Sequence, residues 1–337
     1  MAENSTIEWC DHTFNPWEGC QKVGPGCDNC YAEARDLRFT GGTHWGPNAP
    51  RRLTSQANWA KPIKWNREAA ASGARPRVFC ASLADVFDNA VDPAWREDLW
   101  RLIAATPNLD WLLLTKRPSN IGKMLPTFAH WGNGWPNVWL GCTVVNQSEV
   151  DRDIPKLLAI PAAVRFLSIE PLLGPVDLRF AFSDIRTACC HKCGFRTNAI
   201  GGTCSNDGTI LRGDIGIDWV IVGGESGPHA RPMHPDWARS LRDQCAAAGV
   251  PFLFKQWGEW VVEIDSGRDD PDWRADYSIK FQDYGNMKWL NLNGGCGFHG
   301  DRFHVMRRIG KKAAGRLLDG VEHNGFPEVQ REAGNSR

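Results

Sequence analysis

Three cysteines near the start of the chain have the types and spacing to hold an inorganic cofactor. Cys20, Cys27 and Cys30 are separated by six and then two residues, in a segment rich in glycine and proline. Such residues let a loop fold tightly around a compact core. Thiolates on loops of this kind hold iron–sulfur clusters or zinc. We therefore expect a metal centre within residues 20–30.

The number of thiolates favours one kind of centre. Three of them leave one iron of a 4Fe-4S cluster open, and that iron can chelate the amino and carboxylate groups of S-adenosylmethionine (SAM). Electron transfer to the sulfonium then gives a 5′-deoxyadenosyl radical, which abstracts hydrogen from an unactivated carbon. The alternative is a structural zinc site with Cys10 as fourth ligand. Zinc sites usually pair two short knuckles, and only the Cys27–Cys30 knuckle is present here.

A second group of cysteines predicts a further metal site. Two knuckles, each with two intervening residues and a following glycine, are formed by Cys190 with Cys193 and by Cys204 with Asp207. This pattern is typical of a small zinc ribbon in which an aspartate replaces the last cysteine, and oxygen ligands are acceptable to zinc. A neighbouring histidine or cysteine could replace Asp207. A ribbon that has lost its metal and an auxiliary iron–sulfur cluster are the alternatives.

The order of apolar and helical segments predicts the fold that carries these sites. Short runs rich in Val, Ile, Leu and Phe are typical of buried parallel strands, and they occur at 77–82, 110–115, 138–143, 164–169, 218–223 and 250–255, with an earlier one near 7–10. Helical patterns alternate with them, including one capped by Asp92 and Pro93 and one that runs from Pro235 to Gly249. We predict an α/β fold, a partial or complete TIM-like (β/α) barrel of parallel strands with a small Cys-rich insertion.

The domain boundaries follow from the interruptions of this pattern. The barrel should span residues 1–320 and be interrupted by the zinc-ribbon-like insertion at 183–216, with a C-terminal tail at 321–337. Residues 261–300 have no clear period and are expected to form an irregular excursion. The segment after Gly310 predicts a short basic helix.

Polar residues follow the predicted strands, where the carboxyl ends of a barrel's strands converge on one mouth. As candidates to bind SAM we select Asp85, Lys116, Glu170, Glu225 and Lys255. Glu225 follows a Gly-Gly turn whose backbone could approach a ligand. Helix capping and loop structure are the alternative explanation for each residue. Cys142 ends another strand and is the candidate catalytic hydrogen donor, although packing as a small buried hydrophobe is the favoured interpretation.

Several fragments of the sequence resemble a known family. They include Phe14–Cys20, Gly26–Ala32, Val220–Pro228, Phe254–Gly258 and Gly310–Gly320. They look like those of a phage-associated family of uncharacterised three-cysteine-motif proteins, which is similar to radical SAM enzymes and distantly to spore photoproduct lyase. The resemblance implies that Cys20, Cys27 and Cys30 are the cluster ligands and that Tyr31 packs beside SAM.

Composition limits the environment and the partners. The 39 basic and 39 acidic residues balance, so no global field draws the chain onto nucleic acid or an anionic membrane. The sequence has neither a signal-peptide pattern nor a membrane span, and the 12 cysteines, most of which gather in two clusters, suit a reducing compartment. We therefore expect a cytoplasmic protein.

The function predicted from the sequence is that of a radical SAM enzyme acting in nucleobase modification or repair. Its cofactors would be a 4Fe-4S cluster and SAM, with zinc as a further one, and its partners SAM, a nucleic-acid substrate and a partner protein. The alternative is a non-catalytic, zinc-stabilised barrel that binds nucleic acid or a partner protein.

Overall fold

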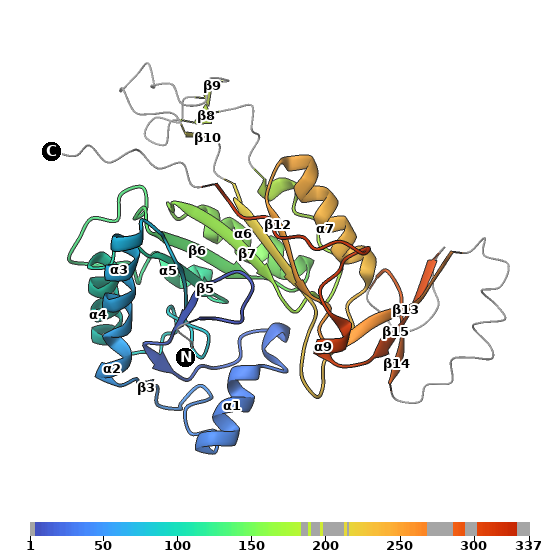
Figure 1. Ribbon diagram of the computed structural model, residues 1–337, viewed down its shortest axis with the longest axis horizontal. Coiled ribbons are helices and arrows are strands. Elements are labelled where there is room, and N and C mark those ends of the chain that lie inside the picture. Colours follow the sequence, from blue (N-terminus) through green and yellow to red (C-terminus); the bar gives the residue numbers. More distant parts are fainter. Residues whose placement is uncertain are drawn as a thin grey trace.

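A seven-stranded parallel sheet forms the centre of the protein (Figure 1). The computed structural model describes residues 4–182, 188–189, 196–197, 212–213, 216–267, 286–293 and 302–328. The strands of the sheet lie side by side in chain order: β1 (His12–Phe14), β4 (Arg77–Cys80), β5 (Asp110–Thr115), β6 (Val138–Thr143), β7 (Val164–Ile169), β11 (Trp219–Gly223) and β12 (Phe252–Gln256). This is a half-barrel, so the predicted α/β class is confirmed as a partial TIM-like barrel.

Helices connect these strands and supply the outer layer. They are α3 (Lys61–Ser72), α4 (Pro93–Ala104), α5 (Pro118–Ile121), α6 (Gln147–Leu158) and α7 (Pro235–Ala248). The predicted boundary residues are confirmed for two of these helices. The Asp92 carboxylate accepts a hydrogen bond from Ala94 N at the start of α4, and α7 ends at Gly249, whose φ of 67° suits a residue without a β-carbon.

The two faces of the sheet belong to different apolar layers because successive strand residues point to opposite sides. One face packs on the helices, and the main core on that side includes Leu113 of β5 together with residues of α4, α6 and α7. The other face carries a second apolar cluster rich in aromatic side chains, among them Trp9, Phe79, Phe166 and Trp219. A β-carbon at Gly141 would collide with the Phe166 ring, so this glycine makes room for the second cluster.

Smaller elements surround the sheet. The cysteine loop lies between the β2–β3 pair, β2 (Trp17–Glu18) with β3 (Arg52–Leu53), and helix α1 (Tyr31–Thr40), and it contains a 3₁₀ turn at Pro25–Cys27. The remaining short elements are α2 (Gln56–Trp59), a 3₁₀ turn at Arg179–Ala181, and α9 (Lys311–Ala314), the short basic helix predicted from the sequence. Three two-residue strands also pair antiparallel: β8 (Ala188–Cys189), β9 (Arg196–Thr197) and β10 (Arg212–Gly213).

Three expectations from the sequence are corrected. The first strand is β1 rather than residues 7–10, which form a turn whose Trp9 and Cys10 fill the second apolar cluster. The segment expected to be irregular contains an antiparallel sheet of β13 (Trp260–Gly267), β15 (Arg302–Arg308) and β14 (Met287–Leu290), drawn beyond β12 in Figure 1. Part of the predicted tail belongs to the barrel.

The C-terminal segment runs along the free edge of β12. Phe254 N donates to the carbonyl of His323, Gly325 N donates to that of Phe252, and Leu253 bridges Asn324 in antiparallel register. Phe326 packs against the second apolar cluster. This segment therefore protects an edge strand that would otherwise expose unpaired backbone groups.

No helix in the described part of the chain is long and apolar enough to cross a membrane.

Candidate metal centre

The three cysteines of residues 20–30 lie on one loop at the carboxyl edge of the sheet. Cys20 is held by a backbone bridge to Trp45, Cys27 ends the 3₁₀ turn, and Cys30 is the N-cap residue of α1. All three are free thiols, with Cys27 buried and the other two half-buried. The loop thus presents its sulfurs from a β-bridge, a 3₁₀ turn and a helix start.

Two glycines allow this loop to approach the barrel closely. A β-carbon on Gly24 would come within 2.5 Å of a Glu149 carboxylate oxygen, and one on Gly26 within 2.7 Å of a Val145 methyl carbon. Both contacts are shorter than real β-carbons make. The loop therefore rests directly on the connection between β6 and α6, which explains the glycine-rich spacing of the motif.

An ion-pair cluster fastens the loop to the segment after β11. The Glu225 carboxylate is buried and accepts bonds from Arg231 N, Nε and Nη2 and from Asn29 Nδ2. Arg231 also donates to Asp28 Oδ2 at 2.9 Å and to the carbonyl of Pro25 at 2.8 Å. We call these five residues the loop clamp. Glu225, selected from the sequence to bind SAM, thus contacts Asn29 of the loop and Arg231, and SAM binding by it stays a prediction.

The Gly-Gly turn before Glu225 has a packing role as well. A β-carbon on Gly224 would collide with the carbonyl of Trp257, and one on Gly223 would lie 3.2–3.3 Å from the Glu170 side chain. The close approach that these glycines allow is therefore to the segment after β12 and to Glu170.

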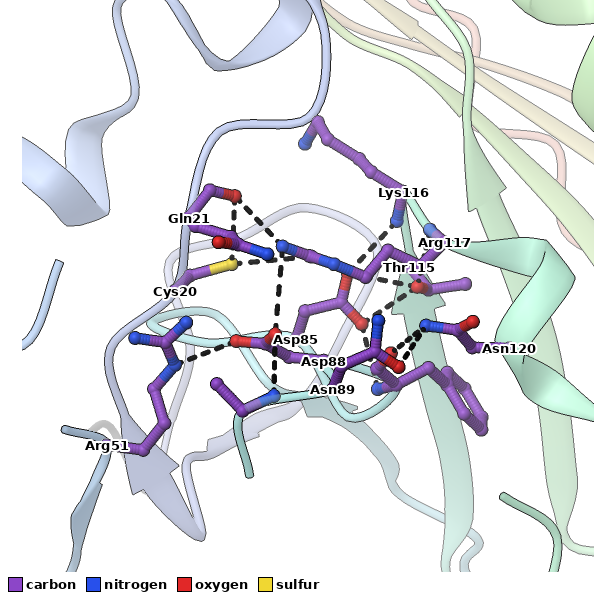
Figure 2. Close-up of polar contacts among 12 residues, drawn as sticks. Cys20, Gln21, Arg51, Asp85, Asp88, Asn89, Thr115, Lys116, Arg117 and Asn120 are labelled. Carbon is purple, nitrogen blue, oxygen red and sulfur yellow. Dashed lines mark hydrogen bonds and ion pairs between the residues drawn. The ribbon is translucent and has the colours of Figure 1, made fainter. Parts of the chain in front are cut away.

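Arg117 lies against Cys20 and joins it to a buried carboxylate. Figure 2 shows its guanidinium between the Cys20 sulfur and Asp85. Nη1 is 3.5 Å from Cys20 Sγ and 2.8 Å from Asp85 Oδ2, and Nη2 donates to the carbonyl of Gln21 at 3.0 Å. Burial, reinforced by Asp85, raises the pKa of the Cys20 thiol to about 11 although Arg117 opposes the change. Metal binding would therefore displace a proton from Cys20.

Asp85, a predicted SAM ligand, has its oxygens occupied by protein groups. It is 5% exposed and accepts from the Thr115 hydroxyl, from Phe87 N and Lys116 N, and from Arg117. The structure thus gives it a positioning contact with Arg117. Arg117 follows Lys116 just after β5 and was not selected from the sequence.

Lys116 and Tyr31 are oriented differently from Asp85. The Lys116 ammonium points away from the Arg117–Asp85 contacts (Figure 2), and its chain passes Gly26. Tyr31 is 61% exposed, but its hydroxyl reaches inward and donates to the carbonyl of Ser82 at 2.5 Å. Burial of that hydroxyl raises the pKa of Tyr31, so the phenol remains neutral.

Glu170 and Lys255 form a third polar group near the same edge. Lys255 Nζ lies 2.9 and 2.7 Å from the two carboxylate oxygens of Glu170, and Gln256 Nε2 donates to one of them at 2.7 Å. The sequence selected both charged residues, and the structure pairs them with each other across β7 and β12.

Cys142 lies on the helix-side face of the sheet, one residue before the end of β6. It is fully buried in the main core on the helix-side face of β6, and burial raises its pKa well above the ordinary thiol value. This placement agrees with the packing role favoured from the sequence, and the hydrogen-donor role stays a prediction. The second predicted metal site, Cys190, Cys193, Cys204 and Asp207, lies outside the described residues.

The donor set at Cys20, Cys27 and Cys30 suits a cluster better than a single zinc ion. A zinc ion binds thiolates at about 2.3 Å and so draws their sulfurs together. In the described part of the chain, the sulfurs of these three cysteines do not all lie within 4.8 Å of one another. Thiolates of a 4Fe-4S cluster each bind a different iron and stand further apart.

The potential ligand atoms of His234, Asp236 and His304 do all lie within 4.8 Å of one another. Arg239 Nη1 already lies 2.7 Å from Asp236 Oδ1 and 3.1 Å from Asp265 Oδ2, and His304 Nε2 lies 3.0 Å from Asp265 Oδ1. A guanidinium at this position neutralises the carboxylates that a metal would need. The group is therefore an ion-pair network that joins α7 to the β13–β15 sheet.

Comparisons with known proteins identify a family and a set of structures. A family model described as "Protein of unknown function (DUF5131)" matches residues 4–327. No curated protein matches the chain. A mutant of spore photoproduct lyase with bound AdoMet and dinucleoside spore photoproduct is 11% identical, with a TM-score of 0.37, and the match covers 88% of this chain and 69% of that chain. Another mutant, with dinucleoside spore photoproduct, is 12% identical, with a TM-score of 0.39 and coverage of 91% and 71%.

Proposed function

The chain belongs to this family of unknown function, and we propose that it is an iron–sulfur enzyme of the radical SAM type. The observation that carries the proposal is the position of three free thiols on one loop at the carboxyl edge of a parallel half-barrel. Catalytic sites of barrels lie at that edge. The loop contacts the segments after β5, β6 and β11, so it lies where those strands end.

Cys20, Cys27 and Cys30 would hold the cluster, with Arg117 beside the first of them. When bound, a 4Fe-4S cluster with SAM supplies a 5′-deoxyadenosyl radical for hydrogen abstraction. Among the described residues no ion pair is found for the Lys116 ammonium, which would receive a carboxylate. Tyr31 offers a neutral aromatic ring directly after Cys30.

The other polar residues divide the remaining roles. Glu170 and Lys255, paired with each other, offer hydrogen bonds to a ribose or an amino group. Asp85 and Glu225 keep Arg117 and the cysteine loop in position. In this arrangement two of the five polar candidates act through a neighbouring arginine.

We extend the proposal to a nucleobase substrate, following the family resemblance of the sequence. The exposed end of α1 supports this choice. Phe39 is 67% exposed, and the guanidinium carbons of Arg35 and Arg38 lie 5.5 and 5.3 Å from its ring centre. Aromatic rings beside arginines bind single-stranded nucleic acids by stacking and charge. The same helix begins at Cys30, so such a surface continues from the cluster loop.

The proposal is tested by anaerobic reconstitution of the full chain with iron and sulfide. We expect a brown protein with about four irons per chain, and 5′-deoxyadenosine formed from SAM under reduction. Cys27→Ala should lose both the colour and the product. Cys245→Ala, which removes a buried thiol of α7, should keep both. A colourless, zinc-loaded protein would favour the non-catalytic alternative, and a full cluster without deoxyadenosine would exclude the radical SAM activity.

A further inference from the structure

Arg117 is the cation in direct contact with a predicted cluster ligand. Its Nη1 lies 3.5 Å from Cys20 Sγ, and its side chain is 7% exposed. We propose that Arg117 is a positioning residue that sets the reduction potential of the cluster through its contact with Cys20. This inference rests on the proposed function, because it requires a cluster at Cys20.

The guanidinium is held in one orientation by groups on three sides. Nη1 donates to Asp85 Oδ2 at 2.8 Å, and Nη2 donates to the Gln21 carbonyl at 3.0 Å. Its backbone N donates to the Thr115 hydroxyl, which itself donates to Asp85. The N–H group aimed at Cys20 is therefore preorganised, and it cannot swing into solvent without breaking several buried hydrogen bonds.

The positive charge of Arg117 and its hydrogen bond to Cys20 both favour the reduced state of the cluster. Reduction adds one negative charge to a cluster, and a cation close to a ligand sulfur stabilises the added charge most strongly where water is excluded. Hydrogen bonds to cluster sulfurs and the local net charge are both known to set such potentials. Arg117 supplies both at Cys20, so its removal should make the cluster harder to reduce.

A neighbouring arginine provides a matched control. Arg51 belongs to the same buried network, with its side chain 1% exposed and its Nε 2.7 Å from Asp88 Oδ2. Figure 2 draws a contact from Arg51 to Asp88 and none from Arg51 to the Cys20 sulfur. The hydrogen bonds found for Arg51 go to Asp88 and to the carbonyls of residues 44, 46 and 49. Arg51→Gln therefore removes the same charge without removing a contact with the sulfur.

The experiment is a redox titration of the reconstituted full chain, followed by electron paramagnetic resonance of the reduced cluster. The samples are wild type, Arg117→Gln, Arg117→Lys and Arg51→Gln. Because Arg117→Gln leaves Asp85 buried without its cation, the double variant Arg117→Gln with Asp85→Asn is included. It removes both charges and keeps the network neutral, so it serves if the single variant does not fold.

We expect Arg117→Gln to lower the ratio of reduced to oxidised cluster about tenfold at a fixed potential, a shift of about 59 mV for one electron. The double variant, which also removes the negative charge of Asp85, should shift the potential in the same direction but less. Arg117→Lys should also shift less than Arg117→Gln, and Arg51→Gln less than half as much. Unchanged potentials in both Arg117→Gln variants would overturn the inference, as would an equal shift in Arg51→Gln. A wild-type protein that assembles no cluster would refute the proposed function instead, so the two failures are distinguishable.

Discussion

The loop clamp allows a quantitative test of how the cysteine loop is held. In the Arg231→Gln variant, Glu225 would lose two of its four hydrogen bonds, those from Arg231 Nε and Nη2 at 2.9 and 2.7 Å. The bonds from Arg231 N and Asn29 would remain. A hydrogen bond to a charged group contributes about 1.5–3 kcal/mol, but Arg231 is 33% exposed, so solvent reduces that contribution. We expect a loss of about 2–3 kcal/mol in the free energy of unfolding.

Glu225→Gln and the double variant complete the cycle. Because Glu225 is 6% exposed, its carboxylate has little water to replace the missing guanidinium. The two substitutions should therefore be coupled by about 1.5 kcal/mol or more, in the range found for residues that share a hydrogen-bonded network. The clamp also reaches Asp28 and Pro25. Arg231→Gln should thus speed the release of iron from the reconstituted loop.

Urea unfolding of the cluster-free protein measures the first effect, and the rate of iron transfer to a chelator measures the second. Arg179→Gln is the control, because Arg179 pairs with Asp177 where the two side chains are 80% and 47% exposed. It should change the stability by less than about 0.5 kcal/mol. A coupling between Arg231 and Glu225 below about 0.5 kcal/mol would refute the reasoning.

Two further outcomes follow from the packing and the burial of single residues. Gly224→Ala should destabilise the protein by about 3 kcal/mol, because the new methyl would collide with the backbone carbonyl of Trp257; Gly174→Ala, whose β-carbon would meet nothing closer than 3.8 Å, should be nearly neutral in the same urea assay. Burial and the neighbouring His304 lower the pKa of His234 from 6.5 to about 4, so the unfolded chain binds the proton first as pH falls. The free energy of unfolding should therefore keep its full contribution from His234 above about pH 6.5 and fall by about 3 kcal/mol towards pH 4. His234→Gln should remove much of this pH dependence.

The strands of the half-barrel could be predicted from the sequence for a clear physical reason. A parallel strand covered on both faces is a nearly continuous apolar run, as at β5 and β6. The β13–β15 sheet was missed because its pairing is not local. Trp260 pairs with Arg308 across more than 40 residues, and β13 itself mixes apolar with charged side chains.

The polar contacts at the carboxyl edge of the sheet could be predicted less completely from the sequence. The positions of Glu170 and Lys255 at strand ends were visible in the sequence, but their mutual ion pair depends on which strands become neighbours around β11. Arg231 lies in the loop after β11 without a local pattern that marks it as a partner of the cysteine loop. Its role becomes visible only when residues 25–29 and 225–231 are brought together by the fold.

Two arginine–carboxylate pairs hold the cysteine loop, one at each end. Arg117 with Asp85 contacts Cys20 and Gln21, and the clamp of Arg231 contacts residues 25–29. Buried ion pairs often contribute no more stability than apolar side chains of similar volume, so stability alone does not explain two of them here. They do supply directed donors at fixed positions. The loop must present its three sulfurs in one geometry for a cluster, and directional contacts at both of its ends meet that requirement better than apolar packing would.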